Sequence, residues 1–227
     1  MQEEMGLMHL WSHGDWVTRA VALLLLAMSL ASWAVLLLRA LDIWRARGLA
    51  RRVPAFWQQP GYEQALAALG DAEDNPFADL ARAGHDASRE QGGIEAALQS
   101  GLSASDWITR ALQRSIEDSQ ARLQTGLAVL ASVGSTAPFV GLFGTVWGIY
   151  HALMGIGAAG QATIDQVAGP IGEALIMTAL GLAVAIPAVL GYNALVRGNK
   201  AVSRDLQRFA HDLQTYFVTG ARQLTKA

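Results

Sequence analysis

The sequence predicts an all-α membrane protein with three transmembrane helices, long cytoplasmic helical extensions and a small cytoplasmic helical bundle. Its 227 residues are 52% hydrophobic and have a mean hydropathy of +0.25. This composition is too apolar for an ordinary soluble domain and too charged for a chain wholly buried in lipid. Three apolar runs each approach or exceed the roughly 20 residues that cross a bilayer. The remaining segments show helical spacing of apolar residues and no strand-like alternation.

The first elements are a short segment, residues 1–19, and a first membrane helix, residues 20–38, which contains no charged residue. A cleavable signal peptide is the rival interpretation of this run, but it requires a basic leader and a shorter apolar core. The leader here is acidic, with Glu3, Glu4 and Asp15 against Arg19, and the run ends at Arg39. We therefore expect residues 20–38 to be retained as an anchor.

Residues 39–126 form the predicted cytoplasmic helical region. Pro60, Gly70 and the Asn75-Pro76 pair divide its first part into short helices. From Ser103 onward apolar residues recur at helical intervals, which predicts a helix that runs without a break into the second apolar run; these residues are Trp107, Ala111, Ile116, Leu123, Leu127 and Leu130.

The second and third membrane helices are predicted at residues 127–154 and 168–196, joined by a periplasmic turn at 155–167. His151 is the only Asp, Glu, Lys, Arg or His between Arg122 and Asp165, and Glu173 is the only one between Asp165 and Arg197. The third helix is expected to continue into a cytoplasmic C-terminal helix, residues 197–227, because apolar residues keep their helical spacing there; they include Val202, Leu206, Phe209, Leu213 and Phe217.

The distribution of basic residues predicts the orientation. Sixteen of the seventeen Lys and Arg residues lie between Arg39 and Arg122 or between Arg197 and Lys226. The positive-inside rule places both segments in the cytoplasm. The N-terminus and the 155–167 turn are therefore expected outside, and the C-terminus inside.

Small residues repeat at heptad spacing within the second and third runs. They are Gly134, Gly141, Gly148 and Gly155 in the second run, and Ala174, Gly181 and Ala188 in the third. Such a row predicts close packing of helix backbones in lipid. Thr145 falls on the first row, and Pro187 is expected to kink the third helix because it removes a backbone hydrogen bond.

Two long motifs make the chain recognisable as a member of a known family. The segments STAPFVGLFGTVWGI (135–149) and GPIGEAL (169–175), followed by Thr178, AIPAV (185–189) and Tyr192-Asn193, closely resemble the ExbB/TolQ/MotA family of proton-channel subunits. The close match covers roughly residues 130–195. The Thr-Ala-Pro-Phe-Val run and the short cytoplasmic region resemble the ExbB branch more than TolQ, and MotA differs by a fourth span.

The resemblance implies a role, an assembly and a place in the cell. Thr145 and Thr178 match threonines that line the family's pore, around the transmembrane aspartate of a partner subunit. The family forms rings of identical subunits, typically homo-pentamers, which hold single-span ExbD-like or TolR-like helices. Located in the bacterial inner membrane, these complexes use proton flow to drive a TonB-like or TolA-like energy transducer. A TolQ-like subunit of the Tol-Pal envelope system and a passive membrane scaffold without proton conduction stay open as alternatives.

Glu173 is a candidate proton-pathway residue on its own chemistry. A carboxylate within a membrane helix costs several kcal/mol unless it faces a cavity or a partner. An interfacial position near the outer end of the helix is the alternative. Glu173 and Thr178 are separated by about 140° on an ideal helix, so the two side chains do not point along one narrow line.

Other functions find no support in the sequence. A net charge of −2 and the absence of basic clusters argue against a nucleic-acid partner, and the absence of cysteine excludes thiolate chemistry. The GxGxxG pattern at 155–160 ends a membrane helix, where no strand precedes it, so we interpret it as a turn. His9 and His13 lack a third metal ligand. We expect no metal, no cofactor and no enzymatic activity.

Overall fold

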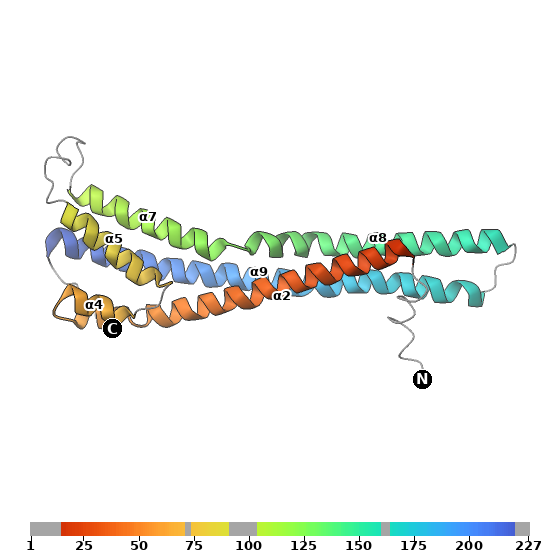
Figure 1. The fold of residues 1–227 in the computed structure, drawn as a ribbon, viewed down its shortest axis with the longest axis horizontal. Helices are drawn as coiled ribbons and strands as arrows, with labels where there is room; N and C mark the ends of the chain where they lie inside the picture. Colours follow the sequence, from red (N-terminus) through yellow and green to blue (C-terminus); the bar gives the residue numbers. More distant parts are fainter. Residues whose placement is uncertain (1–14, 71–73, 91–103, 160–163, 221–227) are drawn as a thin grey trace. The chain divides into compact units, whose positions relative to one another are not determined.

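The computed structural model describes residues 15–70, 74–90, 104–159 and 164–220, and all regular secondary structure in these ranges is helical (Figure 1). This confirms the all-α class. His9, His13 and the last residue of the GxGxxG pattern lie outside the described residues. The helices, in chain order, are α2 (Trp16–Ala50), α3 (Val53–Gln58), α4 (Tyr62–Leu69), α5 (Pro76–Glu90), α7 (Ala104–Gln124), α8 (Leu127–Ala159) and α9 (Ile164–Thr219).

Three helical segments are long and apolar enough to cross a membrane, as predicted. They are Trp16–Gln58, Ser105–Gly155 and Gly169–Thr219. Each exceeds the length that a bilayer requires, because further helical sequence with polar residues adjoins the apolar run, after a short turn in the first two segments. The chain divides into two compact units, to which α2 and α9 both contribute: unit 1 comprises Met1–Leu38 and Gly126–Ala194, and unit 2 comprises Arg39–Thr125 and Leu195–Ala227.

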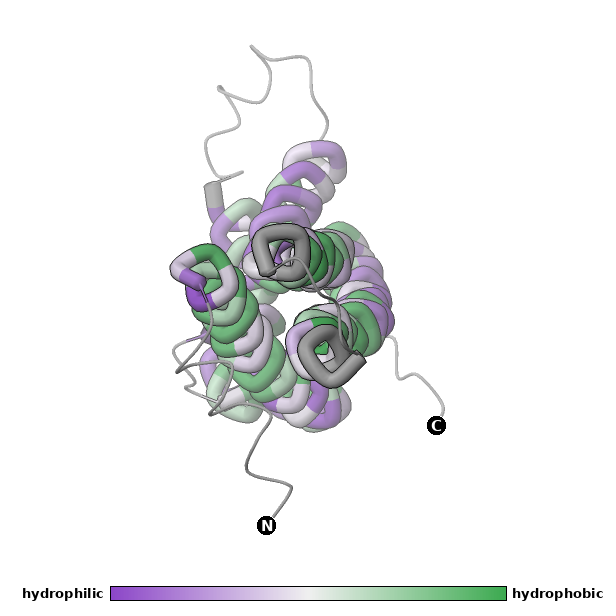
Figure 2. The backbone as a smooth tube through the Cα atoms, turned by 90° about the vertical axis from the view of Figure 1, so that its right-hand side faces the viewer, coloured by the Kyte–Doolittle hydropathy of each residue, from purple (hydrophilic) through white to green (hydrophobic). Residues whose placement is uncertain are grey.

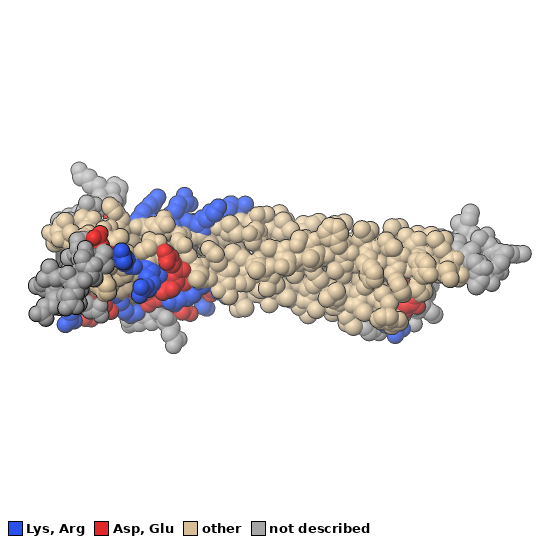
Figure 3. All heavy atoms as spheres, turned by 90° about the horizontal axis from the view of Figure 1, so that it is seen from above, with Lys and Arg blue, Asp and Glu red and all other residues tan. Residues whose placement is uncertain are grey.

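Unit 1 consists of the apolar parts of α2, α8 and α9. Figure 2 shows hydrophobic residues along much of these helices. Large apolar side chains are exposed on its surface, for example Leu30 on α2, Phe139 on α8 and Leu190 on α9. An exposed apolar surface of this extent is typical of a protein that meets lipid or other subunits. The face seen in Figure 3 is nearly free of charged side chains over unit 1, apart from one small group.

The helix that we predicted to run unbroken from Ser103 into the second apolar run is interrupted. α7 ends at Gln124 and α8 begins at Leu127. Between them Gly126 has φ of 84°, in the left-handed region that side chains disfavour. Glycine permits this change of direction at low energetic cost. By contrast, α9 is a single helix of 56 residues and continues past Arg197, in agreement with the prediction.

Unit 2 contains the short helices that the Pro and Gly residues predicted. Asn75 joins two of them and is only 1% exposed. Its side-chain oxygen accepts hydrogen bonds from the backbone N–H groups of Phe77 and Ala78, both at 3.1 Å, and so caps the start of α5. Its amide nitrogen donates to the carbonyl oxygens of Leu69 and Gly70 at the end of α4. One side chain therefore satisfies backbone groups of two helices.

The core of unit 2 is aromatic and aliphatic. Phe209 packs edge-on against Phe56 with ring centroids 5.3 Å apart, and the centroid of the Phe77 ring lies 6.0 Å from that of Phe209. On α7 and α9, polar side chains add direct links: Gln120 donates to the Ser203 hydroxyl at 2.6 Å, and Gln214 donates to the Thr109 hydroxyl at 2.8 Å. Charged side chains gather on the surface of this unit (Figure 3).

Candidate functional site

Glycines bring α8 and α9 together within unit 1. A Cβ atom added to Gly141 would lie 2.6 Å from the Met177 carbonyl oxygen and 3.0 Å from the Gly181 Cα. One added to Gly181 would lie 2.6 Å from the Ala137 oxygen, and one added to Gly148 would lie 2.8 Å from the Ala174 Cβ. These contacts involve backbone or Cβ atoms, which cannot move aside without separating the helices. We call this contact the α8–α9 interface.

The other glycines named from the sequence lie elsewhere. A Cβ at Gly134 would meet the Val189 side chain, which can rotate, whereas a Cβ at Gly155 would meet nothing within 4 Å. The structure also shows close contacts that heptad spacing did not indicate. Added Cβ atoms would meet Val21 of α2 at Gly144, and Leu36 of α2 at Gly191.

Thr145 and Thr178 meet at the α8–α9 interface. Thr145 is 6% exposed, and its hydroxyl oxygen lies 2.5 Å from that of Thr178. The same hydroxyl lies 3.1 Å from the Gly141 carbonyl oxygen on its own helix and 3.0 Å from the Ala174 carbonyl oxygen on α9. Thr178 is half-buried. The two threonines that the family resemblance singled out are thus in direct contact.

The Thr145 hydroxyl has more neighbouring acceptors than protons to donate. A threonine hydroxyl has one proton to donate and two lone pairs to accept. Both neighbouring carbonyl oxygens of Thr145 are acceptors only, so when its proton is donated to one of them, Thr178 is the donor in the threonine pair. With either hydroxyl as the donor in the pair, the Thr178 oxygen keeps a lone pair that can accept a further hydrogen bond.

Glu173 lies on α9 just over one turn before Thr178 and is half-buried. It does interact with another group. Along the interface, Thr145 lies between Glu173 and Thr178, because its hydroxyl contacts the carbonyl of Ala174, the residue after Glu173. Glu173 and Thr178 thus occupy neighbouring turns of α9, and Thr145 lies on the facing helix α8.

A second polar contact in unit 1, which we did not predict, joins α8 to the residue before α2. The Nε2 atom of His151 lies 3.2 Å from a carboxylate oxygen of Asp15. The imidazole also packs against the Trp147 ring, with centroids 4.7 Å apart. The two residues of the pair are far apart in the chain, so no local spacing could have indicated it.

Three prolines lie within the long helices: Pro138 in α8, and Pro170 and Pro187 in α9. The kink that we predicted at Pro187 stays a prediction. Among the residues that the structure describes, no three His, Cys, Asp or Glu side chains are grouped so that they could hold a metal ion. What the α8–α9 interface offers chemically is a pair of hydroxyls and a nearby carboxyl group in a largely apolar surrounding.

Comparison with known proteins identifies the family. Residues 74–208 match the MotA/TolQ/ExbB proton channel family. The chain belongs to this family. It is 44% identical to the biopolymer transport protein ExbB of Xanthomonas campestris pv. campestris, over 96% of this chain and 91% of the relative. It is 42% identical to ExbB of Neisseria meningitidis, over 92% and 96% respectively. The Tol-Pal system protein TolQ of Haemophilus influenzae is more distant, at 32% identity over 95% of both chains.

Proposed function

We propose that this protein is a proton-channel and motor subunit of an inner-membrane complex that uses the proton motive force to energise TonB-dependent transport across the outer membrane. The observation that carries the proposal is the contact between the Thr145 and Thr178 hydroxyls within a helix pair otherwise built from small and apolar residues. Family membership and the higher identity to proteins named ExbB than to TolQ support this choice.

The threonine pair suits proton transfer by orientation rather than by carrying charge. Whichever hydroxyl donates in the pair, the Thr178 oxygen keeps a lone pair that can accept a hydrogen bond from water or from a protonated carboxyl group on a partner helix. Thr145 acts as the positioning residue, since it holds the Thr178 hydroxyl. In this proposal the carboxyl group belongs to an ExbD-like single-span subunit within a ring of copies of this chain, a homo-pentamer. A TonB-like protein receives the mechanical output.

The energy available sets how many protons are needed. One elementary charge that crosses the membrane releases about 2.3 kcal/mol per 100 mV. A single proton therefore supplies little more than a few hydrogen bonds, and a large mechanical step requires several. This favours a repeated cycle in which each proton causes a small motion.

The first experiment removes the hydroxyls and keeps the side-chain volume. Thr145→Val and Thr178→Val should each abolish energy-dependent uptake through a TonB-dependent receptor, whereas Thr178→Ser should keep part of it. Ser32→Ala is the matched control, because Ser32 is also buried in unit 1 but donates only to the Met28 carbonyl of its own helix. Assembly is checked by size after detergent extraction. Normal uptake in the Thr145→Val/Thr178→Val double variant would refute the pore role and favour a passive scaffold.

Glu173 is tested separately as a relay group. Glu173→Gln preserves shape and hydrogen bonding but cannot exchange a proton, so it should strongly impair uptake, whereas Glu173→Asp should keep some. An interfacial anchor would work nearly as well with Gln as with Glu. Near-normal uptake with Glu173→Gln at equal protein level would leave the threonine pair and the partner's carboxyl group as the proton path.

The proposed orientation has the N-terminus in the periplasm and the C-terminus in the cytoplasm. It is supported by the concentration of Lys and Arg in residues 39–122 and 197–226. A periplasm-specific reporter fused after Gly157 should be active, and the same reporter fused after Gly70 should be silent. The opposite pair of results would reverse the direction of proton entry.

A further inference from the structure

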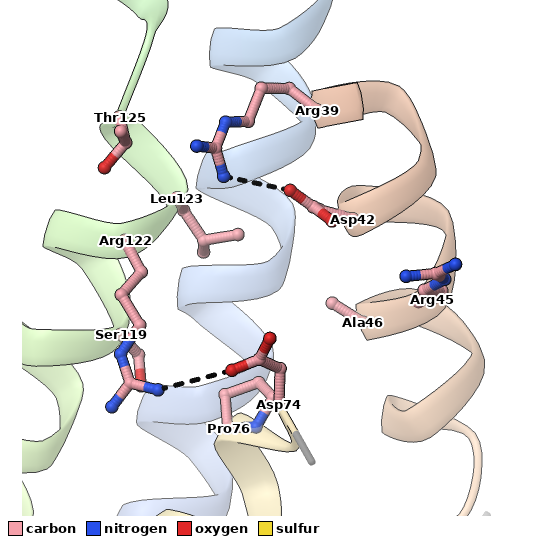
Figure 4. A pocket seen from close by; sticks show the side chains of 10 residues that line it. All are labelled: Arg39, Asp42, Arg45, Ala46, Asp74, Pro76, Ser119, Arg122, Leu123 and Thr125. Atoms are coloured by element: carbon pink, nitrogen blue, oxygen red, sulfur yellow. Dashed lines mark hydrogen bonds and ion pairs between the residues drawn. The ribbon is translucent and has the colours of Figure 1, made fainter. Parts of the chain in front are cut away.

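Unit 2 contains a pocket of about 280 Å³ whose walls come from three helices (Figure 4). Arg39 and Asp42 project from α2 toward α7, and Arg122 extends from α7 toward Asp74, just before α5. Arg45 lines the same pocket from the next turn of α2. Three guanidinium groups and two carboxylates line this space, so the lining itself carries one net positive charge, and a further carboxylate, Asp79, lies within ion-pair distance of Arg122.

The arginines have hydrogen-bond donors to spare. A guanidinium group carries five N–H donors in a planar fork. For Arg39 one donor is directed at the Asp42 carboxylate, 2.9 Å away. The Nη1 atom of Arg122 lies 3.6 Å from Asp79 and 3.9 Å from Asp74, which are ion-pair distances beyond the usual range of a hydrogen bond. Most donors of the two groups are therefore available to an additional anion.

Ser119 adds an uncharged hydrogen-bond donor to the pocket. Ser119 lies on α7 one turn before Arg122, is only 5% exposed and lines the pocket. Its hydroxyl makes no hydrogen bond to another residue that the structure describes, whereas those of Thr109 and Thr125 donate to a carbonyl one turn back. The Ser119 hydroxyl therefore has a proton to donate to an acceptor in the pocket.

The lining residues adjoin the apolar runs in sequence. Arg39 directly follows the apolar residues 20–38, and Thr125 lies two residues before α8 begins at Leu127. Arg45 and Ser119 are each about two turns of helix, or roughly 10 Å, farther from the apolar runs. Headgroups occupy several ångströms on each side of the hydrocarbon core. With the apolar runs spanning the membrane, the pocket would begin at the depth where lipid phosphates lie.

We propose that this pocket binds the phosphate of an anionic phospholipid headgroup at the cytoplasmic surface of the membrane. Arg39 and Arg122 donate to the phosphate oxygens as planar forks, the geometry that suits arginine to phosphate, and Ser119 donates a further hydrogen bond. The net positive charge selects an anionic over a zwitterionic headgroup. The proposal does not depend on proton conduction, so its failure would leave the proposed function intact.

The test is a lipid titration of the full-length protein in detergent, followed by native mass spectrometry. Phosphatidylglycerol is the probe, with phosphatidylcholine as the zwitterionic lipid and glycerol 3-phosphate as the soluble phosphate ester. Arg39→Gln and Arg122→Gln should each weaken phosphatidylglycerol binding about fivefold, and the double variant about 25-fold. Ser119→Ala, which changes no charge and is expected to fold normally, should weaken it about threefold.

Arg114→Gln is the matched control, because Arg114 is an exposed arginine of α7 that does not line this pocket. It should change binding by less than about twofold, as expected for a screened surface charge. An equal loss in Arg114→Gln, or normal binding in both the double variant and Ser119→Ala, would overturn the proposal. Equal affinity for glycerol 3-phosphate would replace the lipid by a soluble phosphate ester, and equal affinity for phosphatidylcholine would refute selection by charge.

Discussion

A single methyl group at Gly141 should measurably destabilise the α8–α9 interface. The added Cβ would lie 3.0 Å from the Gly181 Cα and 2.6 Å from the Met177 oxygen. Carbon atoms in contact normally lie about 3.5–4.0 Å apart, so the two helices must separate by about 0.5–1 Å. A gap of that width forfeits about a quarter to a half of the attraction between the facing atoms. Overpacking of this kind costs about 1–3 kcal/mol.

Gly155→Ala provides the comparison, because a Cβ at that position meets nothing within 4 Å. Alanine is a better helix former than glycine by up to about 1 kcal/mol, so Gly155→Ala should be neutral or stabilising. The same gain partly offsets the overpacking cost in Gly141→Ala.

The assay is thermal unfolding of the purified full-length protein in detergent, followed by circular dichroism. A chain of this size loses about 2–4 °C of melting temperature per kcal/mol, so Gly141→Ala should melt about 2–10 °C below the unmodified protein. Gly155→Ala should melt at or above it. Equal melting temperatures for the two variants would show that the close helix contact does not contribute to stability, and the packing argument would fail.

Three further changes test unit 2. Asn75→Ala should lower the free energy of unfolding by about 2–4 kcal/mol, because it removes a helix cap and leaves two buried carbonyls unpaired. Chemical denaturation measures this change. Asn75→Asp keeps the acceptor but not the donor, so its free energy of unfolding should lie between those of the unmodified protein and Asn75→Ala. Burial, with smaller effects from Asp86 and Glu63, raises the pKa of Tyr62 to about 12 from 10.0. Since the unfolded chain then loses this proton first, stability should fall above about pH 10 and should fall less in Tyr62→Phe; identical pH profiles would contradict this. Burial also raises the pKa of Asp212 above 3.8, so Asp212→Asn should stabilise the protein at pH 7 and lose that advantage once the pH drops below about 4, where both states are protonated.

Much of the fold follows from local sequence patterns. Long runs without charge can form only helices in lipid, where every backbone N–H and C=O must be paired within the chain. Pro60 and Gly70 end helices because of their own backbone restrictions, wherever the rest of the chain lies. The interruption at Gly126 escaped prediction because the apolar spacing continues across it. A helix tolerates an isolated glycine, and only tertiary packing determines whether that glycine adopts a positive φ.

The candidate site was predictable in its members but not in its contacts. Periodicity placed Gly141 and Gly155 in the same row, yet only Gly141 reaches α9, because a spacing rule does not say where two helices diverge. The motif singled out Thr145 and Thr178, but their hydrogen bond depends on the register between α8 and α9. The pairing of His151 with Asp15 depends on the fold alone.

The residue that follows Asn75 has a consequence for chemical ageing. Asparagine side chains deamidate slowly when the next backbone nitrogen attacks the side-chain amide, releases ammonia and closes a cyclic imide. Here the next residue is Pro76, whose nitrogen bears no hydrogen and cannot close that ring. The amide that joins α4 to α5 is thereby protected from the usual route by which asparagine turns into aspartate. The buried connection between α4 and α5 is therefore expected to outlast asparagines that precede other residues.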